Sequence, residues 1–255
     1  MKSILAVVVA VSMVSAAWAD EKEDLANAAK KSSEAKNYSF KGESKTELPA
    51  FGGGQGGPQE SKFEGKFESG VGTIILTDQQ EIVKVGGKTA SRPRAEWRVT
   101  NDNAEGGGGG GGRGGRGGMM GGMLGRGTTK APHEDLKDFG AKIEKATKAD
   151  RKETIGETEC EIISFTLTED AAKAMMPGGG MMGRMAQDAT ITGEGKAFIA
   201  DGAIVKIEVT VKITASFQGN DFEVTTTRST LIYDVDKTKV EIPADAKKAI
   251  DKAAD

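Results

Sequence analysis

The sequence predicts a mainly β protein with flanking helices, an α+β fold built on a curved antiparallel sheet, or incomplete β-barrel, with helices on its concave side. The first observation is a period of two: apolar and polar residues alternate over long stretches, which is typical of strands with one face in water. The second is a set of hairpin turn signals, such as Gly86-Gly87 and Asp201-Gly202. Roughly nine to eleven such strands form a sheet that has to cover its apolar face or curl upon itself.

The first nineteen residues have the features of a secretory signal peptide. Lys2 gives a positive start, Ile4–Val14 is an apolar run broken only by Ser12, and Ala17-Trp18-Ala19 supplies small residues for cleavage after Ala19. A membrane anchor needs about 20 apolar residues, and charged residues follow this shorter run at once. No cysteine ends the signal, so a lipoprotein anchor is not indicated. We therefore expect an exported protein, periplasmic or extracellular, without a transmembrane segment after cleavage, and a single domain over residues 20–253.

The mature chain is expected to begin with a helix from Asp20 to about Lys36. In Tyr38–Leu48 the even positions are apolar or small and the odd ones are charged or polar, which indicates a strand with one wet face. A glycine-rich hairpin loop leads to a second alternating strand that starts near Phe63 and runs to Val71. Shorter strands are expected at Thr73–Leu76, Glu81–Val85 and Glu96–Thr100.

A low-complexity insert separates this half from the next. Of the 22 residues in 106–127, 15 are glycine, three arginine, three methionine and one leucine. Such a segment cannot bury enough apolar surface to offset the entropy of ordering glycine, so we expect it to be disordered. Beyond it, one face of an amphipathic helix is predicted between about His133 and Ala149. The residues on that face are Leu136, Phe139, Ile143 and Ala146.

The C-terminal half starts with an extended segment, Ile155–Leu167, and a short helix, Glu169–Met176. A second glycine- and methionine-rich loop occupies residues 177–187. The strand Ala189–Ile199 then leads through Asp201-Gly202 into a long strand, whose alternation predicts a strongly curved sheet. One face of that strand carries Val205, Ile207, Val209, Val211, Ile213, Ala215 and Phe217. Phe222–Asp234 runs back, and a last strand, Lys239–Ile242, precedes a helix at Pro243–Ala253.

Composition narrows the function classes. The formal charge of −3 becomes one unit more negative when Lys2 is removed, and it is spread thinly, so no polyanion is indicated as the main partner. Cys160 is the only cysteine, which rules out an intramolecular disulfide, and it stands in an apparent strand where a buried, inert thiol is expected. The fold must therefore be held by its core.

The order of the elements resembles the LolA-like superfamily of periplasmic lipid and lipoprotein carriers. The resemblance covers about Asp24 to Ile250 without the glycine-rich inserts. The segments that carry it are Asn37–Gly42, Thr154–Phe165, Gly195–Ile207 and Val240–Ala246. It implies an incomplete barrel around an apolar cavity that accepts acyl chains. Its motifs are degenerate, so no ligand-contacting residue of the family is transferred to this chain.

The leading functional hypothesis is a non-enzymatic protein that binds an apolar ligand, a lipid or a lipidated partner, inside the concave face. The candidate lining is Phe165, Ile207, Val209, Val211, Ile213 and Phe217. The same residues also suit an ordinary filled core. In that case the protein is a structural or interaction protein of the envelope, with the glycine-rich loops as flexible contacts.

The methionines support a third hypothesis. Met1 and Met13 leave with the signal, and the other eight lie in the two glycine-rich loops. They are Met119, Met120, Met123, Met175, Met176, Met181, Met182 and Met185. Thioethers suit Cu(I), but they also give adaptable apolar contact, here as a cover over a cavity mouth, and compositional drift is the plain alternative.

The remaining motifs argue against catalysis and nucleic acid. Arg113-Gly-Gly-Arg116 is an RGG-type repeat, but it is short, lacks Phe and Tyr, and follows a signal peptide, so no nucleic-acid partner is expected. His133 is the lone histidine, at a predicted helix start, and no G-x-S-x-G motif accompanies a serine. Zinc would lack histidine partners. We therefore predict no catalytic residue, no metal site and no cofactor.

Overall fold

The computed structural model describes residues 20–48, 57–93, 96–101, 130–175, 189–217 and 220–253. The predicted signal peptide 1–19, the insert 106–127 and the loop 177–187 lie outside the described residues.

A helix at residues 20–33 opens the described chain. The strands are β1 (Asn37–Leu48), β2 (Gly57–Glu68), β3 (Gly72–Thr77), β4 (Glu81–Val85), β5 (Lys88–Arg92), β6 (Arg98–Asn101), β7 (Ile143–Lys148), β8 (Glu153–Ile155), β9 (Thr158–Leu167), β10 (Thr190–Ala200), β11 (Ala203–Phe217) and β12 (Asn220–Tyr233). The labelled helices are α2 (Pro132–Leu136), α3 (Phe139–Lys142), α4 (Glu169–Ala174) and α6 (Ala244–Lys252).

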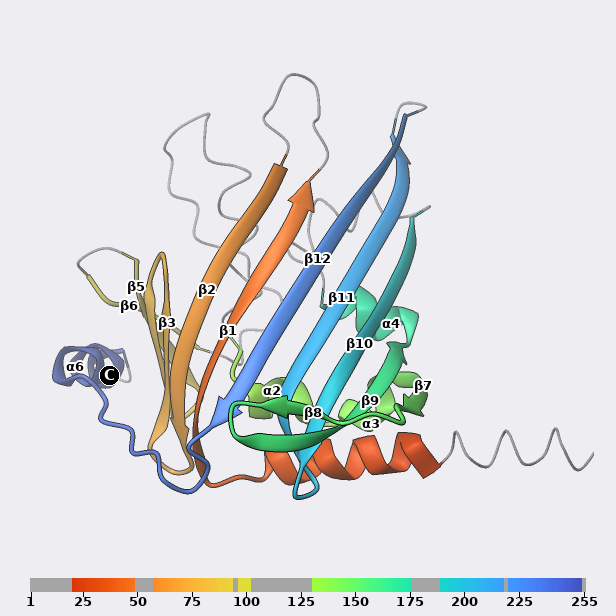
Figure 1. The fold of residues 1–255 in the computed structure, drawn as a ribbon. Helices are drawn as coiled ribbons and strands as arrows, with labels where there is room; N and C mark the ends of the chain where they lie inside the picture. Colours follow the sequence, from red (N-terminus) through yellow and green to blue (C-terminus); the bar gives the residue numbers. More distant parts are fainter. Residues whose placement is uncertain are drawn as a thin grey trace, which may run out of the picture.

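These strands form one antiparallel sheet of twelve strands, curved and open, which confirms the predicted fold class (Figure 1). The order is β6-β5-β4-β3-β2-β1-β12-β11-β10-β9-β7, and β8 pairs with β9. The first and last strands, β1 and β12, pair at the centre of the sheet. The two edges, β6 and β7, are consecutive in the sequence.

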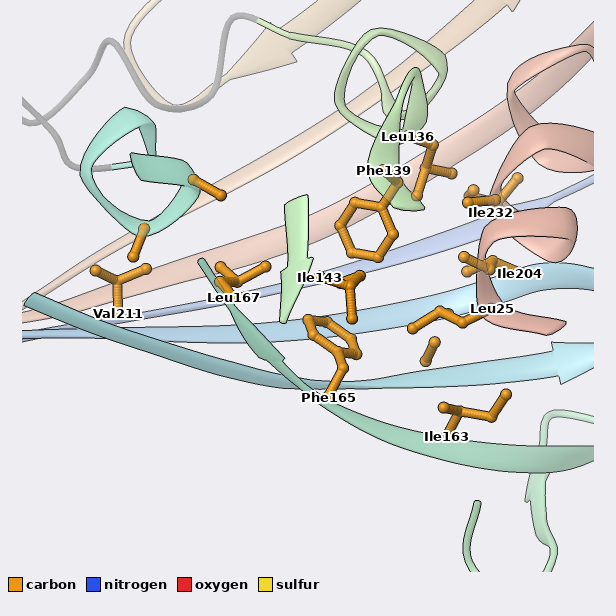
Figure 2. Packing of buried hydrophobic residues seen from close by; sticks show 14 of the residues in the cluster. Leu25, Leu136, Phe139, Ile143, Ile163, Phe165, Leu167, Ile204, Val211 and Ile232 are labelled. Carbon is orange, nitrogen blue, oxygen red and sulfur yellow. The ribbon is translucent and has the colours of Figure 1, made fainter. Parts of the chain in front are cut away.

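The concave face of the sheet carries the main core. Alternate residues of the strands point to this side, among them Tyr38, Phe40 and Phe63, and the helix at 20–33 with α2, α3 and α4 packs against them. Figure 2 shows Leu25 from the first helix and Phe139 from α3 facing Ile143, Ile163 and Phe165 of the strands. The prediction that helices cover the concave face is confirmed for these four.

Three glycines on the concave face each lie beneath a phenylalanine ring. Phe63 faces Gly42, Phe40 faces Gly65, and Phe165 faces Gly195, each pair being direct partners on neighbouring strands. A Cβ added at Gly195 would come within 2.5 Å of Cζ of Phe165. The missing side chain lets the ring lie flat on the neighbouring backbone, the arrangement by which aromatic residues fill a glycine gap in a curved sheet.

The opposite face carries two smaller clusters. Helix α6 packs Ala246 and Ile250 onto Val83 and Ala90 of the edge strands β4 and β5, so this helix, unlike the others, covers the outer face. Near the other edge, Cys160, Ile162 and Phe198 form a second outer cluster with Ile155 of β8 beside it. The expectation that Cys160 is buried is confirmed, and burial raises the pKa of its thiol.

A bulge at Val205 of β11 changes which residues of this strand face the core. The pairing shifts between Phe198 and Ile199, so that Ile204 lies in the main core while Val205 packs with the outer cluster. The predicted placement of Val205 on the same face as Ile207 is therefore wrong. The turn between the two strands has positive φ at both Asp201 and Gly202, as expected for a two-residue hairpin.

Two further predictions of local structure are wrong, and one strand was missed. The helix expected from His133 to Ala149 is instead α2, α3 and the strand β7, although all four of its apolar residues are buried in the main core. Residues 239–242 form no strand, although Val240 is buried. The polar strand β5 was not anticipated. It pairs with β4 and β6, and its Ala90 points into the α6 cluster.

Candidate functional site

The structure places the six predicted lining residues on β9 and β11. Phe165, Val211 and Ile213 are buried, and Ile207 and Val209 are half-buried against the main core. Phe217 pairs through its backbone with Asn220 of β12. Phe165 meets Phe139 edge to face at 5.4 Å between ring centroids. Around Phe165, the concave face is filled by helix side chains.

The middle of β11 is less covered. Ile207 and Val209 keep part of their surface exposed, and their partners on β10, Ala197 and Gly195, are small. The apolar row continues toward the far end of the strand through Val211, which pairs with Gly193 beneath Ala172 of α4. The concave face of β11 is therefore a continuous apolar strip, half-buried at Ile207 and Val209 and buried from Val211 to Ala215.

The neighbouring strands present polar groups on the same face. Arg228 of β12 lies in one cross-strand row with Val209 of β11 and Ser44 of β1, and the next row joins Val211, Thr226 and Thr46. The two threonine hydroxyls lie 3.1 Å apart, within hydrogen-bonding distance. This strip of hydroxyls and one guanidinium runs beside the apolar strip of β11.

Helix α2 is held to the sheet by three consecutive polar side chains. The Nδ1 atom of His133 lies 2.7 Å from the hydroxyl of Tyr38, which also accepts the His133 backbone N–H. Both carboxylate oxygens of Glu134 lie 2.8 Å from Nζ of Lys84. The carboxylate of Asp135 accepts from Nη1 of Arg228 at 3.0 Å.

These contacts and burial favour the neutral form of His133. The Tyr38 oxygen accepts the backbone N–H of His133, and its own proton makes a second hydrogen bond when Nδ1 is unprotonated. Burial lowers the pKa of His133 and raises that of Tyr38. The imidazole also stacks on Phe67 at 3.9 Å between ring centroids. The predicted position of His133 at a helix start is confirmed by α2, and its ring is a half-buried structural contact.

Two surface hollows involve the outer face. One of about 500 Å³ is lined by the charged side chains of β1 and β2, Lys41, Glu43, Lys62 and Glu64, together with Leu76 and Leu231. Another of about 420 Å³ lies near α4 and includes Thr192, Glu194 and Lys212. None of the six predicted lining residues contributes to either hollow.

Within the described ranges, no group of three or more His, Cys, Asp or Glu side chains is close enough to hold a metal ion. Met175 follows α4 and packs against the main core, so this methionine serves as a core contact. The other seven loop methionines lie outside the described residues.

None of the helices described is long and apolar enough to span a membrane.

Sequence reasoning missed the polar strip and the role of α2. Arg228 and its partner Asp135 are 93 residues apart, and His133 and Tyr38 are 95 apart, so no local spacing joins them. One signal was present: Arg228 stands at an even position of an alternating strand, in phase with Val224 and Ile232, where an apolar residue is expected.

Comparison with known proteins gives similarity of fold. No protein-family model and no curated protein matches the chain. Among solved structures, lipoprotein LppX of Mycobacterium tuberculosis is 7% identical over 88% of this chain and 98% of its own, with a TM-score of 0.48. LprF of Mycobacterium bovis is 6% identical over 89% and 97%, with a TM-score of 0.44. A LolA superfamily protein of Nitrosomonas europaea is 7% identical over 88% and 94%, with a TM-score of 0.32.

These three structures are similar to this chain at 6–7% identity, and the fold class itself rests on the open curved sheet described above. The likeness concerns the fold alone, because identity is far below the level at which site residues correspond. The ligand and its contacts have to be argued from this chain's own residues.

Proposed function

We propose that this is an exported, non-enzymatic protein that binds an apolar ligand, a lipid or a lipidated partner, on the concave face of its sheet. The observation that carries the proposal is the apolar strip of β11, which keeps Ile207 and Val209 half-buried beside the packed core. Partly exposed aliphatic side chains in a row on a concave surface are typical of an apolar binding site. The proposed lining is Phe165 of β9, which lies in the same cross-strand row as Val209, together with Ile207, Val209, Val211, Ile213 and Phe217 of β11.

The first test is the protein's own cargo. We expect an organic extract of the purified mature protein to contain lipid, identified by mass spectrometry in near-stoichiometric amount. An extract without lipid, from protein that also fails to take up a fluorescent acyl-chain probe, would contradict the proposal.

A bulky substitution separates an open strip from a filled core. In an open site, Val209→Trp blocks the ligand and leaves the melting temperature close to that of the wild type. In a filled core, the same change overpacks and costs about 1–3 kcal/mol, which lowers the melting temperature by roughly 2–4 °C per kcal/mol. The matched control is Thr210→Trp, because Thr210 is the next residue along β11 and lies on the outer face.

The alternative function, a structural or interaction protein of the envelope, is favoured by the packing around Phe165 on the concave face. There Phe139, Phe165 and Ile143 leave little room for a ligand. This alternative predicts no lipid in the extract, and loss of partner association when residues 106–127 are deleted. If that deletion abolishes association but leaves probe uptake intact, both activities exist and reside in different parts of the chain.

Export is part of the proposal. Cleavage after Ala19 predicts that protein recovered from the periplasm or the medium begins at Asp20, which N-terminal sequencing checks. An intact N-terminus in that fraction, or confinement of the protein to the cytoplasm, would contradict it.

A further inference from the structure

The concave face divides into two parallel strips of different chemistry. Between Ile207 and Ala215 the core-facing side chains of β11 are all apolar. The two strands beside it, β12 and β1, place hydroxyls and the guanidinium of Arg228 at the same level of the sheet. A surface with an apolar strip directly beside a polar, cationic strip is complementary to a molecule that has an apolar part beside a polar, anionic part.

Arg228 is placed so that a ligand on β11 reaches it. It pairs in register with Val209, one of the half-buried residues of the apolar strip. The guanidinium carbon lies 5.0 Å from the ring centroid of Phe63, which holds the group flat against the concave face. Nη1 donates to the Asp135 carboxylate and Nη2 to the Lys130 carbonyl oxygen at 3.4 Å. In all, 23% of the Arg228 side chain is exposed.

The other basic residues on this face of the described strands are less suited to a ligand. Arg98 of β6 and Lys148 of β7 lie on the two edge strands, and Lys148 pairs with Glu161. Lys84 of β4 meets both carboxylate oxygens of Glu134, and 17% of its side chain is exposed. It also lies on the far side of β1, β2 and β3 from the apolar strip. A ligand whose chain runs along β11 therefore meets Arg228 and not Lys84.

We infer that the ligand of the concave face is an anionic amphiphile, whose phosphate or carboxylate pairs with Arg228 while its acyl chain lies along Ile207, Val209 and Val211. This inference rests on the proposed function. A guanidinium recognises such oxyanions through paired N–H donors, and the hydroxyls of Ser44 and Thr226 beside it can donate to the same group. Asp135 is the internal counter-ion, and the ligand's acid competes with it for Arg228.

The test compares two lysophospholipids with the same acyl chain, binding to the full mature protein below their micelle concentrations. Lyso-phosphatidylglycerol carries a net negative charge and lyso-phosphatidylcholine does not. We expect calorimetric titration to show that the wild type binds the anionic lipid about tenfold more tightly, the effect of one charge-assisted hydrogen bond. Arg228→Met abolishes this preference, and Asp135→Asn increases it severalfold, because it removes the competing carboxylate.

The control is Lys212→Met, which removes the same charge from the outer face of β11 and is expected to keep the preference. If neither lipid binds the wild type, the proposed function itself fails. If both bind equally well, or if the preference survives Arg228→Met, this inference is overturned and the proposed function stands. Should Arg228→Met fail to fold, Asp135→Asn decides, because an unchanged preference in that variant also overturns the inference. Inorganic phosphate alone is not expected to displace the anionic lipid, and displacement would instead indicate a phosphate site.

Discussion

At the scale of single residues, the contact between Tyr38 and His133 has the clearest physical consequence. The hydroxyl of Tyr38 lies 2.7 Å from Nδ1 of His133, and the stacked ring of Phe67 helps to keep water away. Burial is the largest influence on the pKa of His133 and lowers it, while Glu134 raises it, Lys84 lowers it and Asp135 raises it to smaller extents. The folded protein therefore favours the neutral imidazole.

This protonation preference predicts that the protein loses stability in mild acid. Since the folded pKa lies below the ordinary value of 6.5, the unfolded chain binds the proton first as the pH falls, and stability declines through that range. We expect the wild-type melting temperature to fall between about pH 8 and pH 5, and that of His133→Gln to fall less. Parallel pH profiles for the two proteins would show that His133 does not contribute.

The glycines beneath phenylalanine rings predict a second effect at this scale. Gly195→Ala brings its Cβ against the ring of Phe165 and the carbonyl oxygen of Glu208, which cannot both move away. We expect a loss of about 1–3 kcal/mol, measured by urea unfolding. Glu194→Ala, one residue earlier on the exposed outer face, is the control and is expected to stay within about 0.5 kcal/mol of the wild type. Equal stability of the two variants would contradict the packing argument.

At the scale of elements, α6 is joined to the sheet by one apolar contact and one ion-pair cluster. Ala246 is fully buried on Val83 and Ala90, and Arg92 bridges Asp245 at 3.0 Å and Glu81 at 2.5 Å. The cluster is partly exposed, so the apolar contact is expected to dominate. Releasing this contact should therefore detach the helix without disturbing the concave face.

Ala246→Asp tests that expectation, because it places a carboxylate among apolar side chains at a cost of about 3 kcal/mol or more. We expect the amides of residues 244–252 to lose their protection from hydrogen exchange while those of β11 and β12 keep theirs. Ala244→Asp makes the same chemical change at the exposed first turn of α6 and should leave protection intact. Protection of α6 in both variants would show that other contacts hold the helix.

The elements also show what the sequence could and could not predict. Long strands such as β1 and β11 are readable because each buries one face, so the period of two extends over many residues. The segment from about His133 to Ala149 is wrongly predicted to be a helix because four of its apolar residues have helical spacing: Leu136, Phe139, Ile143 and Ala146. The positive φ of 55° at Asp138 separates α2 from α3, and pairing with β9 draws Ile143–Lys148 into a strand. Long-range pairing overrides local spacing here.

In the candidate site, too, features set by neighbouring residues could be predicted, and features set by the pairing of distant segments could not. The apolar strip of β11 could be predicted because its residues are consecutive alternate positions of one strand. The polar strip depends on the register of β1 with β12, which brings Ser44 opposite Arg228 from distant parts of the sequence. The bulge at Val205, opposite Phe198 and Ile199, likewise has no local sign in the sequence, so the face of Val205 could not be assigned.

At the scale of the whole molecule, the sheet is assembled from two halves of the chain. Strands β1–β6 form one half and β7–β12 the other. The halves meet where β1 and β12 pair, with Ser39–Glu47 of β1 opposite Thr225–Tyr233 of β12. Two elements of the second half also reach across to the first. Helix α2 contacts Tyr38 and Lys84, and α6 packs on Val83 and Ala90. The chain between β6 and β7 connects strands at opposite edges of the sheet.

This architecture predicts that the two halves associate without a covalent link. Residues 20–105 and 128–255, produced together as separate chains, should co-purify through a tag on either one, because the strand pairing and both helix contacts remain available. Ile232→Asp in the second fragment places a charge at the junction, opposite Phe40, and is expected to abolish co-purification. Thr227→Asp, on the exposed outer face of the same strand, is the control and should preserve it. Failure of the unmodified fragments to associate would mean that the link through residues 106–127 is needed for assembly. Association that survives Ile232→Asp would mean that the helices, and not the central strands, hold the two halves together.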